Sequence, residues 1–173
     1  LPGNHDNAPL QARVMGDCPV TRAITRDLGN WRLVLLNSAV EGEVPGTLSA
    51  EMLASLDRAM NDWAGPKAVF LHHQPLPVGS PWIDRYPLTQ ASKLWDVLDM
   101  FARVRFVAWG HIHQPFTARR GEVQLLGGPS TAINSLPGRE KFTEDTRGPA
   151  CRWFELAEDG GLTTGLLGKG WEA

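Results

Sequence analysis

Hydrophobic and polar positions alternate in blocks along the chain, and the blocks predict a succession of strands and helices. Residues 31–38 and 67–75 are apolar at consecutive positions and end in polar residues or proline, which is typical of strands buried on both faces. Residues 104–115 repeat this pattern. Over 48–63 and 89–101, apolar side chains recur every three or four positions, so we expect an amphipathic helix in each segment. Alternating strands and helices predict an α/β fold.

The rest of the chain predicts loops and hairpins. Residues 75–87 are rich in proline and glycine, which indicates an ordered loop. Four apolar segments are separated in pairs by turn residues, so we expect two hairpins there. These segments are 115–118 with 123–128 and 151–157 with 162–167. No linker, internal repeat or low-complexity tract interrupts the pattern, and we therefore expect one domain over residues 1–173.

Composition narrows the class of protein. The chain has 173 residues, of which 42% are hydrophobic, and can bury a substantial core. Its net charge of −2 and scattered Lys and Arg argue against nucleic acid as a partner. No apolar run reaches about 18 residues, so no spanning helix and no membrane partner are expected. Cys18 and Cys151 are far apart and form no CxxC unit, which predicts free thiols in a reducing cytoplasm.

All five histidines fall in three short motifs. The motifs are GNHD (3–6), LHHQP (71–75) and GHIH (110–113), and the last two directly follow predicted strands. Open α/β sheets place their ligand sites where strands end. A lone histidine on a strand is most often a packed or surface residue, but five histidines gathered in three motifs favour a metal site. Imidazole and oxygen ligands without thiolate suit Mn, Fe or Zn.

The spacing of the histidines leads to two geometric expectations. If 111–113 are extended, the side chains of His111 and His113 point the same way, roughly 7 Å apart along the strand. They could then reach two metal ions about 3.5–4 Å from each other. His72 and His73 are adjacent and should face opposite sides, so only one of them is expected to be a ligand. The other would fit a packing or ligand-supporting role.

The first motif offers three further polar side chains. Asn4 supplies a neutral amide oxygen as a ligand. We expect His5, which Asp6 could orient and charge, to contact a phosphate or to protonate a leaving oxygen. Taken alone, the motif also fits an ordinary turn, because Gly3 and Asn4 are common turn residues.

The three motifs resemble, in order and spacing, the later metal-binding motifs of the calcineurin-like metallophosphoesterases. More narrowly, the chain is similar to the bacterial 3',5'-cyclic-AMP phosphodiesterases of that superfamily, and the similarity covers nearly the whole sequence. The segments that carry it are LPGNHD, LHHQPLPVGSPWID, GHIHQ, GGPSTAINSLP, FTEDTRGPACRWFEL and DGGLTTGL.

The resemblance implies a four-layer α/β/β/α sandwich with mixed sheets and a dinuclear site of Fe, Mn or Zn that hydrolyses a small cyclic nucleotide. By this similarity Asn4, His72 and His111 would hold one metal, and His113 would help to hold the other. Asn4 and His5 would also face the substrate phosphate, with His5 as the catalytic group that assists the leaving oxygen.

The chain also departs from the family pattern. The family begins with an Asp-x-His motif and a Gly-Asp motif, and neither occurs here, since GNHD already stands at residue 3. We therefore expect the first strands and helices of the sandwich to be missing, as in the C-terminal portion of a phosphodiesterase. Without a bridging carboxylate, the site is expected to bind metal poorly or singly.

Three other functions stay open at this point. The same metals could act on another phosphodiester or on a pyrophosphate. The chain could instead be a non-catalytic module, or a structural zinc module, although it lacks a Cys ligand pattern. Trp82, in the predicted loop, could stack on a nucleobase or simply pack that loop. The sequence predicts no oligomeric state.

Overall fold

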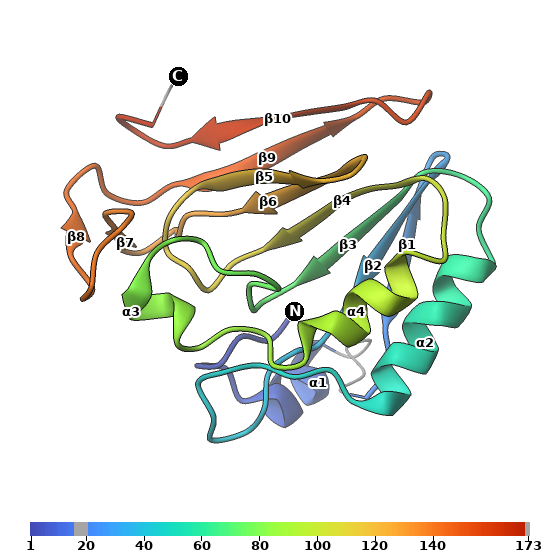
Figure 1. Cartoon of the computed structure of the whole chain (residues 1–173), viewed down its shortest axis with the longest axis horizontal. Coiled ribbons are helices and arrows are strands. Elements are labelled where there is room, and N and C mark those ends of the chain that lie inside the picture. The colour runs from blue at the N-terminus through green and yellow to red at the C-terminus, as the bar shows by residue number, and fades with distance from the viewer. Residues whose placement is uncertain (16–20, 172–173) are drawn as a thin grey trace.

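A six-stranded mixed sheet forms the centre of the fold, which is given by a computed structural model that describes residues 1–15 and 21–171 (Figure 1). From one edge to the other its strands are β1 (Ile24–Leu28), β2 (Trp31–Leu35), β3 (Lys67–Leu71), β4 (Val104–Trp109), β6 (Val123–Gly127) and β5 (Phe116–Arg120). The four inner strands run parallel, and the two edge strands pair antiparallel. Because parallel strands end at the same edge of a sheet, the segments that follow β2, β3, β4 and β6 meet there.

Helices cover one face of this sheet, and a β-hairpin covers the other (Figure 1). The helices are α2 (Ala50–Asn61) and α4 (Ala91–Leu98), and the hairpin is β9 (Cys151–Leu156) with β10 (Leu162–Leu167). Shorter elements lie around the carboxyl edge and at the periphery. They are α1 (Ala8–Met15), α3 (Pro81–Asp84), β7 (Asn134–Ser135) and β8 (Glu144–Asp145).

The inner strands alternate between two separate cores. Val69 and Val107 belong to the cluster under the helices, whereas Ala68 and Phe106 belong to the cluster under the hairpin. In the second cluster the Phe106 ring stacks on that of Phe154 with 5.1 Å between ring centroids. Burial on both faces explains why these strands are continuously apolar in sequence.

Both amphipathic helices are confirmed, and both are shorter than their patterns. α2 begins after Ser49, whose Oγ accepts a hydrogen bond from the backbone N–H of Met52 at 3.0 Å. α4 begins only after Gln90, because that residue has a left-handed backbone with φ of 54°. The predicted hairpins are also present, as β5 with β6 and β9 with β10.

The hydrophobic pattern missed several small elements. β1 is an edge strand whose last three residues are exposed, so its sequence contains no apolar run that would predict a strand. Residues 75–87 form more than a loop, because they include α3, with Pro81 in its first turn. α1 and the two-residue strands β7 and β8 carried no periodic signal.

The mixed α/β class is confirmed. The ranges described by the structure supply three of the four expected layers, namely the helices, the six-stranded sheet and the β9–β10 ribbon. None of the helices in these ranges is long and apolar enough to cross a membrane. Cys151 is a free thiol, and Cys18 lies outside the described residues.

A matched pair of leucine substitutions tests the core under the helices. Leu56 is fully buried there, whereas Leu28 on the edge strand is 60% exposed. We expect Leu56→Ala to lower the free energy of unfolding by about 2–5 kcal/mol, because it removes buried methyl groups and leaves a cavity. Leu28→Ala should change it by no more than about 0.5 kcal/mol. Urea denaturation of both variants measures the difference, and equal effects would contradict this core.

Candidate metal centre

Three polar side chains from distant parts of the chain converge at the carboxyl edge of the sheet. They come from the N-terminal turn, which Figure 1 shows beside the end of β3, from the residue after β3, and from the loop after β4. Asn4 Oδ1 lies 3.0 Å from His72 Nε2 and 3.1 Å from His111 Nδ1. The two ring nitrogens are 3.2 Å apart. The structure thus brings together three of the residues that the motifs predicted.

The N-terminal motif forms a closed turn that presents Asn4. The Gly3 N–H donates to Asp6 Oδ2 at 2.7 Å, and the Asp6 N–H donates to the Gly3 carbonyl at 3.1 Å. Gly3 also packs directly on the His72 ring, since a Cβ at Gly3 would lie 2.6 Å from its Cε1. A side chain at residue 3 would therefore push Asn4 and His72 apart.

The tautomer of His111 follows from its second ring nitrogen. His111 Nε2 lies 3.1 Å from the Tyr86 carbonyl oxygen, which can only accept a hydrogen bond. Nε2 therefore carries the proton, and Nδ1 turns an unshared electron pair toward Asn4 and His72. A backbone carbonyl in this role is a common way to orient a metal-binding imidazole.

Burial keeps both rings neutral. Burial, with a smaller contribution from the neighbouring histidine rings, lowers the pKa of His72 to about 3. Burial likewise lowers the pKa of His111 to about 3, with a smaller effect from the His73 ring. At neutral pH both side chains are thus uncharged imidazoles, which is the form that binds metal ions.

The spacing of the three atoms fits ligands of a single ion. Ligand atoms bound at about 2.1 Å in tetrahedral or octahedral geometry lie roughly 3.0–3.4 Å from each other. The three separations here run from 3.0 to 3.2 Å. Two nitrogens and an amide oxygen suit a borderline or hard transition-metal ion.

His73 is close to this group, but both of its ring nitrogens are used elsewhere. Nitrogens of His72, His73 and His111 lie within 4.8 Å of one another. His73 Nε2, however, donates to the Val44 carbonyl at 3.1 Å, and its Nδ1 accepts from the Ser38 hydroxyl at 2.8 Å. The ring is fully buried, and burial lowers its pKa to about 4. This geometry favours His72 as the ligand and His73 as a brace for the loop after β2.

His113 lies differently from its expected position. The extended path expected for residues 111–113 is wrong, because β4 ends at Trp109 and both histidines have left-handed backbones, with φ of 63° and 50°. His113 Nδ1 donates to the Ile133 carbonyl at 2.8 Å. Its ring still lines a cleft of about 240 Å³ together with His72 and His111.

His5 and Asp6 are exposed and border a second cavity of about 200 Å³, which Asn4 also lines. The Asp6 carboxylate accepts a hydrogen bond from the Gly3 N–H through Oδ2 and so closes the turn; this oxygen is not directed at His5. Trp82 is partly buried against the core under the helices and contacts the Phe142 ring at 5.2 Å between centroids. Packing of the loop is the interpretation of Trp82 that this geometry favours.

Several groups that hold the histidines could not be predicted from residue types. The carbonyl groups of Val44, Tyr86 and Ile133 each accept a bond from a ring nitrogen, and backbone atoms carry no residue-type signal. Ser38 could have been suspected, because it follows a buried strand that ends at the same edge as the histidine motifs.

Comparison with known proteins identifies relatives that are named as phosphodiesterases. No protein-family profile matches the chain. The chain is 42% identical over 167 residues to the 3',5'-cyclic adenosine monophosphate phosphodiesterase CpdA of Pseudomonas aeruginosa, covering 95% of this chain and 60% of that protein. It is 38% identical over 168 residues to CpdA of Escherichia coli K12, with the same two coverages. A 3',5'-cyclic-nucleotide phosphodiesterase of Nostoc is 39% identical over 165 residues, covering 95% of this chain and 62% of that protein.

A solved structure shares the fold. A dimetal phosphatase from Danio rerio superposes with a TM-score of 0.56 at 16% identity, covering 73% of this chain and 59% of that one. The expected similarity to the bacterial 3',5'-cyclic-AMP phosphodiesterases is confirmed by the named relatives, and the superposition confirms the expected fold. The chain spans about 60% of the length of the CpdA relatives that it matches.

The close contact between Gly46 and His73 can be tested by substitution. A Cβ at Gly46 would lie 2.2 Å from His73 Nδ1 and 2.7 Å from the Ser38 carbonyl oxygen. We expect Gly46→Ala to lower the free energy of unfolding by about 1–3 kcal/mol through overpacking. At Gly128 the nearest atom to an added Cβ is 3.5 Å away, so Gly128→Ala is the matched control. Thermal unfolding compares them, and a Gly46→Ala protein as stable as the control would refute the contact.

Proposed function

We propose that this chain, a homologue of bacterial cyclic-nucleotide phosphodiesterases along 95% of its length, carries part of the dinuclear metal site of an enzyme that hydrolyses 3',5'-cyclic AMP to the 5'-nucleotide. One observation carries the proposal. The ligand atoms of Asn4, His72 and His111 converge to within 3.2 Å of one another at the end of the sheet, and both imidazoles are neutral.

In this proposal the described residues divide between two ions. Asn4 Oδ1, His72 Nε2 and His111 Nδ1 hold one, and His113 Nε2, left unprotonated by the bond from Nδ1 to Ile133, helps to hold the other. The donor set is compatible with Fe, Mn or Zn. When bound, such ions supply positive charge that neutralises phosphoryl oxygens and promotes the ionisation of water.

His5 is the proposed proton donor. Its ring is exposed beside Asn4, on a turn that Asp6 closes, so it can reach a substrate at the metal site without being a ligand itself. As a water-derived oxygen bonds to phosphorus and the bond between phosphorus and the ribose 3'-oxygen breaks, the departing oxygen would take a proton from the protonated His5 ring. Proton transfer of this kind typically contributes about 10²–10⁴-fold to rate.

The names of the relatives favour a cyclic nucleotide over other phosphodiesters or a pyrophosphate. A non-catalytic module is disfavoured, because it does not require three partly buried ligand atoms with matched separations. We also propose a cytoplasmic location, in keeping with the free thiol of Cys151.

The first test is metal binding by the chain itself. Among the described residues the site offers only uncharged ligands, so we expect one Mn²⁺ per chain in a calorimetric titration rather than two. His72→Ala should weaken binding at least roughly tenfold, because it removes a direct ligand. His5→Ala should bind Mn²⁺ as the unaltered chain does. No binding by the unaltered chain, or equal losses in the two variants, would contradict the assignment.

The second test concerns hydrolysis and the role of His5. The chain is joined to the part of Pseudomonas aeruginosa CpdA that it does not match, and turnover is measured on cyclic AMP, cyclic GMP, a glycerophosphodiester and a nucleotide-lipid pyrophosphate. We expect cyclic AMP to be preferred. His5→Ala should lower kcat by about 10²-fold or more with unchanged metal content. A parallel fall in metal content and kcat would assign His5 to metal binding instead.

A further inference from the structure

We propose that Asn134 is a positioning residue that fixes the ring of His113, an inference that rests on the proposed role of His113 in the metal site. Asn134 is fully buried, and its side chain forms hydrogen bonds with Ser130 and Gly148. It acts through the two residues on either side of it.

Both neighbours of Asn134 bind His113. The Ile133 carbonyl accepts a hydrogen bond from His113 Nδ1 at 2.8 Å, and the Ser135 N–H donates to the His113 carbonyl at 2.8 Å. One bond sets the rotation and tautomer of the ring, and the other sets the backbone. His113 has φ of 50°, which is unfavourable for a side chain larger than glycine, so its conformation depends on such external bonds.

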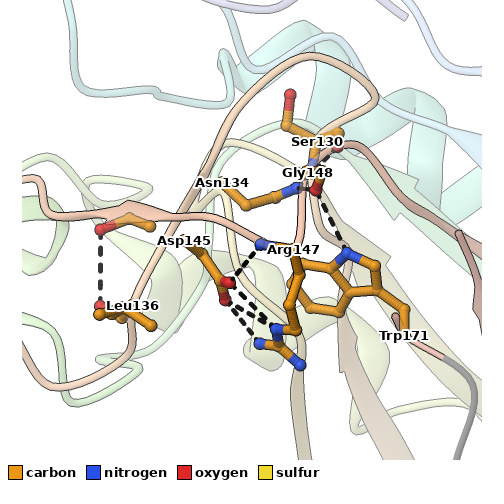
Figure 2. A network of polar contacts seen from close by, with 8 residues as sticks. Ser130, Asn134, Leu136, Asp145, Arg147, Gly148 and Trp171 are labelled. Atoms are coloured by element: carbon orange, nitrogen blue, oxygen red, sulfur yellow. Dashed lines mark hydrogen bonds and ion pairs between the residues drawn. The ribbon is translucent and has the colours of Figure 1, made fainter. Parts of the chain in front are cut away.

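The Asn134 side chain anchors this segment to Ser130 and Gly148, as Figure 2 shows. Its Oδ1 accepts from the Ser130 N–H at 2.6 Å, and its Nδ2 donates to the Ser130 carbonyl at 3.0 Å and to the Gly148 carbonyl at 2.9 Å. These bonds use both amide hydrogens and the carbonyl oxygen. The loop 130–134 is thereby closed into a ring and tied to the segment after β8.

That segment is itself held firmly (Figure 2). The Gly148 carbonyl also accepts from Trp171 Nε1 at 3.2 Å. Arg147 pairs with the buried carboxylate of Asp145 at 2.6 Å, and its Cζ lies 3.7 Å from the centre of the Trp171 ring. Asn134 therefore connects the His113 loop to a rigid support rather than to a free loop.

The arrangement determines which nitrogen of His113 can bind a ligand. With Nδ1–H bonded to Ile133, the unshared pair is on Nε2, and the ring lines the cleft shared with His72 and His111. The His113 ring also lies against the Trp82 and Phe142 rings, but neither contact selects a tautomer. If the Asn134 anchor is lost, the Ile133 carbonyl group is no longer held in place, and the His113 ring can exchange tautomers. A residue important only for stability would not change this tautomer in the folded protein.

The test measures the His113 tautomer by ¹⁵N NMR of the imidazole nitrogens in the metal-free 173-residue chain. The His113 signals are assigned by their disappearance in His113→Gln. We expect the unaltered chain to show Nδ1–H with an unprotonated Nε2, and Asn134→Ala to lose this preference. Leu98→Ala is the control for general destabilisation, because Leu98 is buried in the helix-covered core, and it should retain the preference.

The outcomes separate the alternatives. A folded Asn134→Ala protein with the tautomer of the unaltered chain overturns the proposal, as does an equal change in Leu98→Ala. If Asn134→Ala does not fold, Asn134→Asp, which keeps the size and the acceptor for Ser130, is judged by the same signals. If neither folds, Asn134 is a folding residue and the proposal fails. Because the measurement needs neither metal nor substrate, it stands even if the chimera does not hydrolyse cyclic AMP.

Discussion

The structure around the sheet edge depends on a shortage of hydrogen-bond donors. Asn4 Oδ1, His72 Nε2 and His111 Nδ1 lie within 3.2 Å of one another, yet the proton of His111 is committed to the Tyr86 carbonyl. At most one proton, on His72, then remains to satisfy three electron-rich atoms. The low pKa of both rings prevents a second proton from binding near neutral pH. A cation resolves this shortage at once.

Parts of the fold that do not contact these three atoms keep them close together. Parallel pairing of β3 and β4 brings His72 and the loop carrying His111 to the same edge, and the cores on both faces of the sheet fix that pairing. The Tyr86 carbonyl group then orients the His111 ring, and Gly3 packs against the His72 ring. Packing and hydrogen bonding elsewhere in the fold therefore hold the three ligand atoms in place. Without this support, their side chains would move apart.

Much of this could be predicted from the sequence, for physical reasons that differ between residues. His72 follows a strand whose apolar run is unmistakable, and its place at the sheet edge was predictable. The path through His111 and His113 was not, because their left-handed backbones are imposed by bonds from distant residues such as Ser135. The structural preference for His72 over His73 could not be read from the sequence either, because it depends on the bonds of the His73 ring to Ser38 and to the Val44 carbonyl group. Asn134 carried no sequence signal of its own.

The two adjacent histidines each pack against a residue without a side chain, His72 against Gly3 and His73 against Gly46. These glycines belong to different loops. Because each glycine lacks a side chain, it leaves room for the imidazole ring that packs against it. The geometry of this site thus requires positions without a side chain as well as positions that carry ligands. A design that transplants the ligands without these two gaps would lose the geometry it sought to copy.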